Sequence, residues 1–324
     1  APYASDDTSD QFALEMALAR IRQLSAHEVG HTIGLAHNFA ASSKGRSSVM
    51  DYPHPTLSLN NGEVDFTDAY DTKIGDWDKV SIAYSYSEFK TDEDANLKSI
   101  LNDAFNNGAR FITDQDARPL GSAHAYAHLW DNGSDVSVEL ENLLLIRKNA
   151  IANFSKDNIK SNQPYSVLED VFVPLYFLHR YQTEGVAKVI GGLDYTYAIK
   201  DDGNTIVKRI PGKLERKALA SVIKTLSVEE LAIPKKILNL FPPRAFNYGR
   251  TRESFKSKTG VAFDPFGAVE TASSMTLGLL LHPERVTRLV QHKSLDSSQL
   301  GLAEVLDILI TNSFKKSMLG SKSL

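Results

Sequence analysis

The sequence predicts a mainly α fold with one β-hairpin. Apolar residues recur at the spacing of a helix over most of the 324 positions. An alternation of period two is confined to residues 195–210, around Asp202-Gly203-Asn204, as in a hairpin. Between about residues 38 and 75 neither period is clear, and so long a loop is uncommon in a folded domain unless it has a function.

The first helix is expected from about residue 9 to Thr32 or Ile33. Thr8 and Gln11 have the spacing of a capping box. His27 and His31 continue an apolar stripe that precedes them, and are therefore expected on the same helix face. The stripe consists of Leu14, Ala17, Leu18, Ile21 and Leu24.

Further helices are expected along the rest of the chain, and prolines separate several of them. They cover about residues 76–89, 91–107, 136–154, 166–190, 213–227, 229–240, 265–281, 283–293 and 298–313.

Composition narrows the classes of function. The formal net charge of -4, from 36 Lys and Arg against 40 Asp and Glu, gives no footprint for nucleic acid or for an anionic membrane. No apolar run approaches the roughly 20 residues of a membrane span, and no signal-peptide pattern opens the sequence. Cysteine is absent, so a transition-metal site would have to use histidine and carboxylate ligands.

The motif HEVGHTIGLAH, residues 27–37, carries the strongest functional signal. Four residues advance a helix by about 400°, so His27 and His31 project from one face, one turn apart. Two imidazoles so placed can each put a nitrogen about 2.0–2.1 Å from one Zn²⁺. Glu28 is rotated from His27 by about 100°. Its carboxylate can reach a water at the metal and act as a general base.

His37 can join these residues only if the helix stops. In an unbroken helix it would lie about 15 Å along the axis from His27. Gly34 is placed to end the helix, because glycine accepts the left-handed conformation. Three protein ligands leave a fourth position for water, as in catalytic zinc sites. The alternative is that these are ordinary helix histidines with Gly34 as a C-cap, but the added offsets of Gly34 and His37 favour zinc.

This segment resembles the signature of the metzincin zinc peptidases, H-E-x-x-H-x-x-G-x-x-H followed by a Met-turn. Ser48-Val49-Met50-Asp51-Tyr52 would supply the turn. The resemblance implies that Met50 packs beneath the imidazoles without binding the metal. Tyr52 would reach the metal or the reaction oxyanion, with an ordinary buried tyrosine as the equal alternative. Asn38 follows the third histidine, at a position where the best-known metzincin branches have a different residue. The sequence therefore leaves open which interaction fixes the turn after His37.

The wider sequence is similar to the met-zincins, a family of large bacterial zinc-dependent metalloproteases, most specifically over residues 20–86. The resemblance implies a metzincin lower catalytic subdomain over residues 1–90, consisting of the active-site helix and the Met-turn loop, and a helical C-terminal domain over residues 91–324. It implies endopeptidase hydrolysis of a peptide or protein substrate by a zinc-activated water, with Glu28 as general base. It also implies export to the periplasm or the cell exterior.

Metzincins resemble one another in having an upper subdomain before the active-site helix, and the 26 residues that precede His27 here cannot hold it. We therefore expect this chain alone to be a poor peptidase. Without an upper subdomain, four apolar positions of the helix would be exposed to solvent: Phe12, Met16, Val29 and Ile33. An N-terminal region of the same precursor is the expected partner for that face, with self-association as the alternative.

Two other functions stay open. One is a non-catalytic helical binding or scaffold module with a structural or vestigial zinc site, and the other is a zinc hydrolase of non-peptide amides. His124 and His128 are also four residues apart but lack a third ligand at matching spacing. Nothing in the spacing supports a cleft-lining role for Asp114, Asp116, Arg118 or Trp130.

Overall fold

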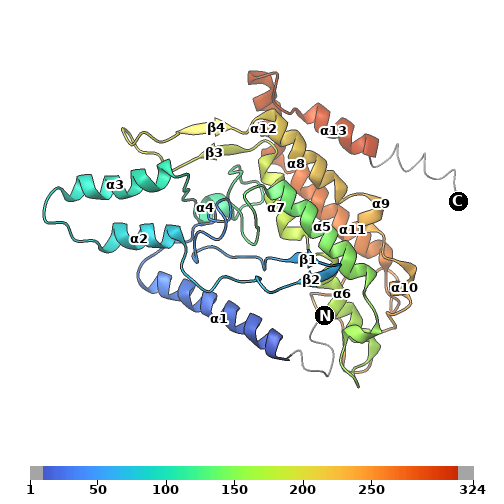
Figure 1. The fold of residues 1–324 in the computed structure, drawn as a ribbon. Coiled ribbons are helices and arrows are strands. Elements are labelled where there is room, and N and C mark those ends of the chain that lie inside the picture. Colours follow the sequence, from blue (N-terminus) through green and yellow to red (C-terminus); the bar gives the residue numbers. More distant parts are fainter. Residues whose placement is uncertain (1–9, 313–324) are drawn as a thin grey trace.

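A computed structural model describes residues 10–312, and the fold is mainly α, as the sequence predicts (Figure 1). The longer helices are α1 (Asp10–Thr32), α2 (Asp76–Tyr86), α3 (Glu93–Asn106), α5 (Val136–Ala152), α6 (Leu168–Tyr176), α7 (Arg180–Val189), α8 (Gly212–Lys224), α11 (Pro265–Leu280), α12 (Pro283–Leu295) and α13 (Leu302–Ile310). The short ones are α4 (Asp114–Ala117), α9 (Val228–Leu231), α10 (Lys235–Leu238), η1 (Lys156–Asn158) and η2 (Tyr165–Val167). None of the described helices is long and apolar enough to cross a bilayer.

Two of the expected helices are broken. The helix expected over 166–190 is two helices, α6 and α7, and Pro174 lies inside the first of them. Proline has no N–H to donate and crowds the preceding turn, and α6 ends soon after, at Tyr176. The helix expected over 229–240 is likewise split into α9 and α10, because the residue before Pro234 is disfavoured in helical conformation.

The structure contains two antiparallel hairpins where the sequence analysis expected one. β1 (Ser58–Asn60) pairs with β2 (Glu63–Asp65) around Asn61 and Gly62, which have φ of 50° and 84°. Two consecutive positive φ values are the mark of a tight I′ turn, and Asn-Gly is its preferred sequence. This hairpin lies within the segment that showed no clear period.

The expected hairpin forms with different bounds. β3 (Leu193–Tyr195) pairs with β4 (Val207–Arg209), so the ladder lies at the base of the hairpin rather than beside Asp202-Gly203-Asn204. Figure 1 shows β3 and β4 extending from the helical part of the molecule alongside α3.

The largest hydrophobic core lies among the C-terminal helices. α7 packs against both α5 and α8, and α12 contacts α13. Leu140, Val186 and Leu219 are completely buried there. A second core joins α6, α10 and α11 around Phe172 and Ile237. The loop-rich segment of residues 33–75 packs on α5 through Leu57, which contacts Leu143 and Ile146.

The apolar stripe of α1 faces the solvent, contrary to the expectation that it shares a face with His27. Leu14 and Ile21 are each 56% exposed, and Leu18 and Leu24 are also exposed. The buried face of α1 instead carries Gln23, His27 and Gly30. Helical spacing identifies a face of a helix, but the neighbouring segment decides which face is buried.

Of the positions expected to lack cover, Val29 is 57% exposed. Met16 and Ile33 are only partly exposed. The side chain of Phe12 and the residue Thr8 of the expected capping box lie outside the described part of the structure. The division of the chain at residue 90 stays a prediction.

Candidate metal centre

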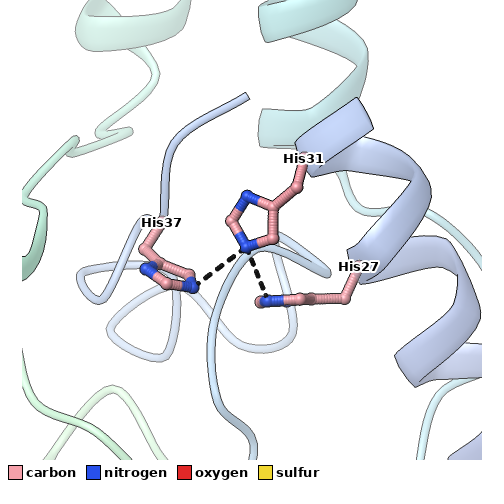
Figure 2. A group of neighbouring side chains, drawn as sticks. All are labelled: His27, His31 and His37. Carbon is pink, nitrogen blue, oxygen red and sulfur yellow. Dashed lines mark hydrogen bonds between the residues drawn. The ribbon is translucent and has the colours of Figure 1, made fainter. Parts of the chain in front are cut away.

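Helix α1 carries the first two histidines of the candidate site. His27 is buried, and His31 lies one turn further along the helix (Figure 2). The Nε2 atoms of the two imidazoles are 3.1 Å apart. The helix thus brings the two rings together on one face, with the geometry that a spacing of four residues requires.

A glycine turn ends α1 and reverses the chain. Gly34 has φ of +87°, a conformation that side chains other than glycine rarely adopt. The N–H of Leu35 donates to the carbonyl of Gly30, and the N–H of Gly34 donates to that of His31. This pair of bonds is the Schellman arrangement of a helix C-terminus. The Tyr86 hydroxyl, from α2, also donates to the Ile33 carbonyl over 2.7 Å.

After the turn the chain returns His37 to the same point. Its Nε2 lies 3.1 Å from the Nε2 of His31, and the three imidazoles surround a common centre (Figure 2). The ligand atoms of the three residues all lie within 4.8 Å of one another. Within the described residues, this is the one group of histidine and acidic side chains so arranged.

Asn38 fixes the returning segment. It is completely buried, and its side-chain amide donates to the carbonyl of Arg110 over 2.8 Å. Its side-chain oxygen accepts from the N–H groups of Ala40 and Ile112. Its backbone N–H donates to the carbonyl of Met50. The interaction that the sequence left open at this position is therefore a bridge to the 110–112 segment and to the Ser48–Tyr52 turn.

The second nitrogen of each imidazole is held by an acceptor. Nδ1 of His27 lies 2.6 Å from the Val49 carbonyl oxygen, and Nδ1 of His31 lies 2.9 Å from that of Leu35. Nδ1 of His37 lies 2.8 Å from the carboxylate of Asp114. A carbonyl or ionised carboxylate oxygen can only accept, so each Nδ1 carries the hydrogen.

The Nε2 atom of His31 therefore lies 3.1 Å from each of the other two Nε2 atoms, and their lone pairs repel unless a cation lies among them. Tetrahedral zinc with Zn–N bonds of about 2.0–2.1 Å would separate its nitrogen ligands by about 3.3–3.4 Å, close to the observed 3.1 Å. The three residues could hold a metal ion. Burial lowers the pKa of His27, and repulsion from His31 and His37 acts in the same direction, which keeps this ligand neutral.

The Ser48–Tyr52 turn packs against the metal helix at Gly30. A Cβ added at Gly30 would lie 2.3 Å from the sulfur of Met50, which is buried. The turn is held from the other side by Asp78 of α2. That carboxylate accepts from the Ser48 hydroxyl over 2.6 Å and from the Val49 N–H over 2.9 Å. Since the Val49 carbonyl holds His27, α2 braces the first ligand through the turn.

Glu28 is exposed and follows His27 directly on α1. Its side chain is thus accessible to solvent.

Tyr52 lies at the edge of the cluster. Its ring centroid is 4.8 Å from that of His37 and 5.5 Å from that of His27. Its hydroxyl oxygen accepts a hydrogen bond of 3.2 Å from the guanidinium of Arg118. Arg118 in turn binds the carboxylate of Asp114.

Asp114 connects these groups, and sequence reasoning did not assign it a role. Partial burial acts to raise its pKa, but hydrogen bonds from His37 and Arg118 outweigh burial and lower the pKa to about 2. The carboxylate is therefore ionised at neutral pH and orients the third histidine. Asp78 and Gly30 were also missed. Asp114 carried no usable signal because it lies far along the chain from His37, whereas Gly30 stands inside the motif at a position that the signature leaves variable.

His124 and His128 do not form a second cluster. They lie outside any helix, and His124 Nε2 bonds to the Tyr195 carbonyl. The nearest ionic partner of His128 is Glu184, at 3.5 Å. The ring of Trp130 lies against that of Tyr52, tilted by 30° with a centroid separation of 5.6 Å.

A cavity of about 690 Å³ borders the turn between His31 and His37. Its walls are formed by Gly34–Ala36, by α2 and α3, and by the β3–β4 hairpin. Aromatic side chains among its lining residues are Trp77, Tyr84, Phe105, Phe111 and Tyr197. Leu35, whose carbonyl lies 2.9 Å from Nδ1 of His31, lines this cavity and connects it to the histidine cluster.

Comparison of the sequence with family models gives one match. The model of a family described as Met-zincin matches residues 9–319. No curated protein and no solved structure matches the chain.

Proposed function

The chain belongs to the Met-zincin family, and from this premise we propose that it is a zinc-dependent endopeptidase that hydrolyses peptide bonds. The observation that carries the proposal is the convergence of three imidazole Nε2 atoms whose Nδ1 atoms are each bound to an acceptor. A neutral three-histidine set leaves one position open at a tetrahedral metal, as catalytic zinc sites do. When bound, zinc acts as a Lewis acid that activates water and polarises a carbonyl group.

In this proposal His27, His31 and His37 are the ligands, and Gly34 and Asn38 keep the third ligand in place. Asp114 orients His37, and the backbone carbonyls of Val49 and Leu35 orient the other two rings. Such outer contacts fix the tautomer of a ligand and raise its basicity. Met50 fills the space against Gly30, as the floor of a Met-turn would.

Glu28 is proposed as the general base. Its exposed carboxylate stands next in sequence to His27 and takes a proton from the attacking water, then delivers it to the leaving amine. A positioned base of this kind contributes about 10²–10⁴-fold in rate. Tyr52 is proposed to donate its hydroxyl hydrogen to the oxyanion that forms on the scissile carbonyl.

A peptide or protein substrate fits the surroundings of the site. The aromatic cavity beside the histidine turn has room for a side chain of the substrate. A scaffold function without catalysis would give no reason for Glu28 and Tyr52 to flank the histidines. Hydrolysis of a non-peptide amide would use the same residues and is distinguished by assay.

Two further parts of the proposal concern the setting of the chain. Helix α1 has an exposed apolar face that consists of Leu14, Leu18, Ile21 and Val29. An N-terminal region of the same precursor is the proposed partner of that face. The proposed location is the periplasm or the cell exterior.

The proposal is tested by metal loading and proteolysis. The chain, and a version extended at its N-terminus, are stripped with a chelator, reloaded with one equivalent of Zn²⁺ and incubated with casein. We expect cleavage that depends on zinc and that the extension increases. Stoichiometric zinc without cleavage of casein or of a peptide library would refute the endopeptidase proposal.

A further inference from the structure

We propose that Arg118 is a positioning residue that orients the hydroxyl group of Tyr52 toward the metal centre. The inference rests on the function proposed above and names a residue that acts through Tyr52 rather than on the substrate.

The guanidinium of Arg118 is fixed between two partners. Its Nε donates to Asp114, and its Nη2 donates to the Tyr52 hydroxyl oxygen over 3.2 Å. The same group lies 5.3 Å from the centre of the Tyr52 ring and 5.4 Å from that of Phe39. These contacts define both the position and the direction of the guanidinium.

The direction of the hydrogen bond determines what Tyr52 can do. Arginine has only donors, so the phenol oxygen must accept from it. The hydroxyl hydrogen of Tyr52 therefore points away from Arg118 and remains available to a substrate. A hydrogen bond received from a cation also strengthens the bond that the hydroxyl itself donates. Both effects suit a donor to an oxyanion.

Asp114 joins this pair to the metal ligands. One of its carboxylate oxygens accepts from Arg118, and the other accepts from Nδ1 of His37 over 2.8 Å. His37, Asp114, Arg118 and Tyr52 thus form a closed ring, since the Tyr52 and His37 rings are in contact. The position of the Tyr52 hydroxyl is therefore fixed relative to His37, the third ligand.

The β3–β4 hairpin braces the segment that carries Asp114 and Arg118. The hydroxyl groups of Tyr195 and Tyr197 both donate to Asp116, which lies on α4 between Asp114 and Arg118 in the sequence. The position of Arg118 is therefore set by a separate part of the fold.

A purely stabilising role fits these observations less well. The side chains of Arg118 and Asp114 are 44% and 39% exposed. Ion pairs at such exposure contribute little to stability. We therefore assign the Arg118–Asp114 ion pair the role of orienting Tyr52.

The test is a double-mutant cycle on the zinc-loaded chain extended at its N-terminus. Arg118→Gln, Tyr52→Phe and the double variant are compared with the parent on fluorescein-labelled casein. We expect Tyr52→Phe to lower kcat by roughly 10²-fold and Arg118→Gln by roughly 10-fold, with KM changed less than about twofold. The double variant should be no slower than Tyr52→Phe, because Arg118 acts through the hydroxyl. Multiplicative losses would overturn the inference.

The matched control is Arg216→Gln. Arg216 also binds a carboxylate, that of Glu304, but it does so through two nitrogens and among the C-terminal helices. Its loss should leave kcat unchanged. An equal loss of activity in this variant would show that the effect of Arg118→Gln is general destabilisation.

A structural readout separates this inference from the proposed function. Crystal structures of the zinc-free parent and of Arg118→Gln should show one conformer of Tyr52 beside His37 in the parent, and a displaced or multiple conformer in the variant. An unchanged Tyr52 would overturn the inference even if casein is cleaved. Absence of cleavage by the parent would refute only the endopeptidase proposal, because the Tyr52 conformation still decides the role of Arg118.

Discussion

Removal of the Asp114 carboxylate should weaken metal binding without removing a ligand. His37 Nδ1 lies 2.8 Å from Asp114, whose pKa of about 2 keeps it ionised at neutral pH. Loss of such a partner typically costs 10–100-fold in metal affinity, about 1.4–2.7 kcal/mol. Because 39% of the Asp114 side chain is exposed, water can replace it in part, and we expect the lower end of this range.

The assay is competition for Zn²⁺ with a chromophoric chelator at pH 7.5. Asp114→Ala should raise the dissociation constant about 10-fold, and Asp114→Asn less, because the amide oxygen can still accept from His37. Asp170→Asn is the matched control, since this carboxylate also binds an arginine, Arg244, but lies on α6. An unchanged dissociation constant for Asp114→Ala, with native circular dichroism, would refute the role given to this residue.

The remaining predictions concern the base, the packing of the turn and the buried histidines. Glu28→Gln should keep zinc affinity within about twofold but lower casein cleavage by roughly 10²–10⁴-fold; full turnover with zinc bound would identify another base. Gly30→Ala should destabilise the chain by about 1–3 kcal/mol, because its Cβ would meet the buried sulfur of Met50, whereas Gly278→Ala in α11, which has open space, should be neutral or stabilising in the same urea titration. Burial lowers the pKa of His124 and His128 to about 4 and that of His179 to about 3, so each stays neutral when folded and gains a proton on unfolding below about pH 6.5. Stability should therefore fall as pH decreases from about 6.5 toward 4, by up to about 1.4 kcal/mol per pH unit for each histidine; a urea midpoint that does not move between pH 7 and pH 5 in chelator would contradict this.

The sequence predicted the structure best where the local conformation depends on residues that are close together in the chain. The offsets of His27, His31, Gly34 and His37 determine a helix, a turn and a return, and the structure brings the three rings together. Helical geometry over a few residues is nearly fixed, so spacing alone places these side chains. The Asn61-Gly62 turn belongs to the same local class, and attention to that dipeptide would have identified β1 and β2.

The rest depends on contacts between distant segments. Asp114 contacts His37 and Arg118 contacts Tyr52 from the two ends of the short helix α4, which the hairpin tyrosines hold. No spacing within one helix predicts such a contact. The orientation of α1 shows the same limit. Its apolar residues indicate a helix face, yet the face that packs on the Ser48–Tyr52 turn carries His27 and Gly30.

Anomalous diffraction at the zinc edge, on crystals of the zinc-loaded chain, tests the central claim most directly. The account predicts one strong peak about 2.0–2.1 Å from the Nε2 atoms of His27, His31 and His37, with Asp114 still bound to Nδ1 of His37. A zinc-saturated crystal with no peak among these three residues would contradict the account.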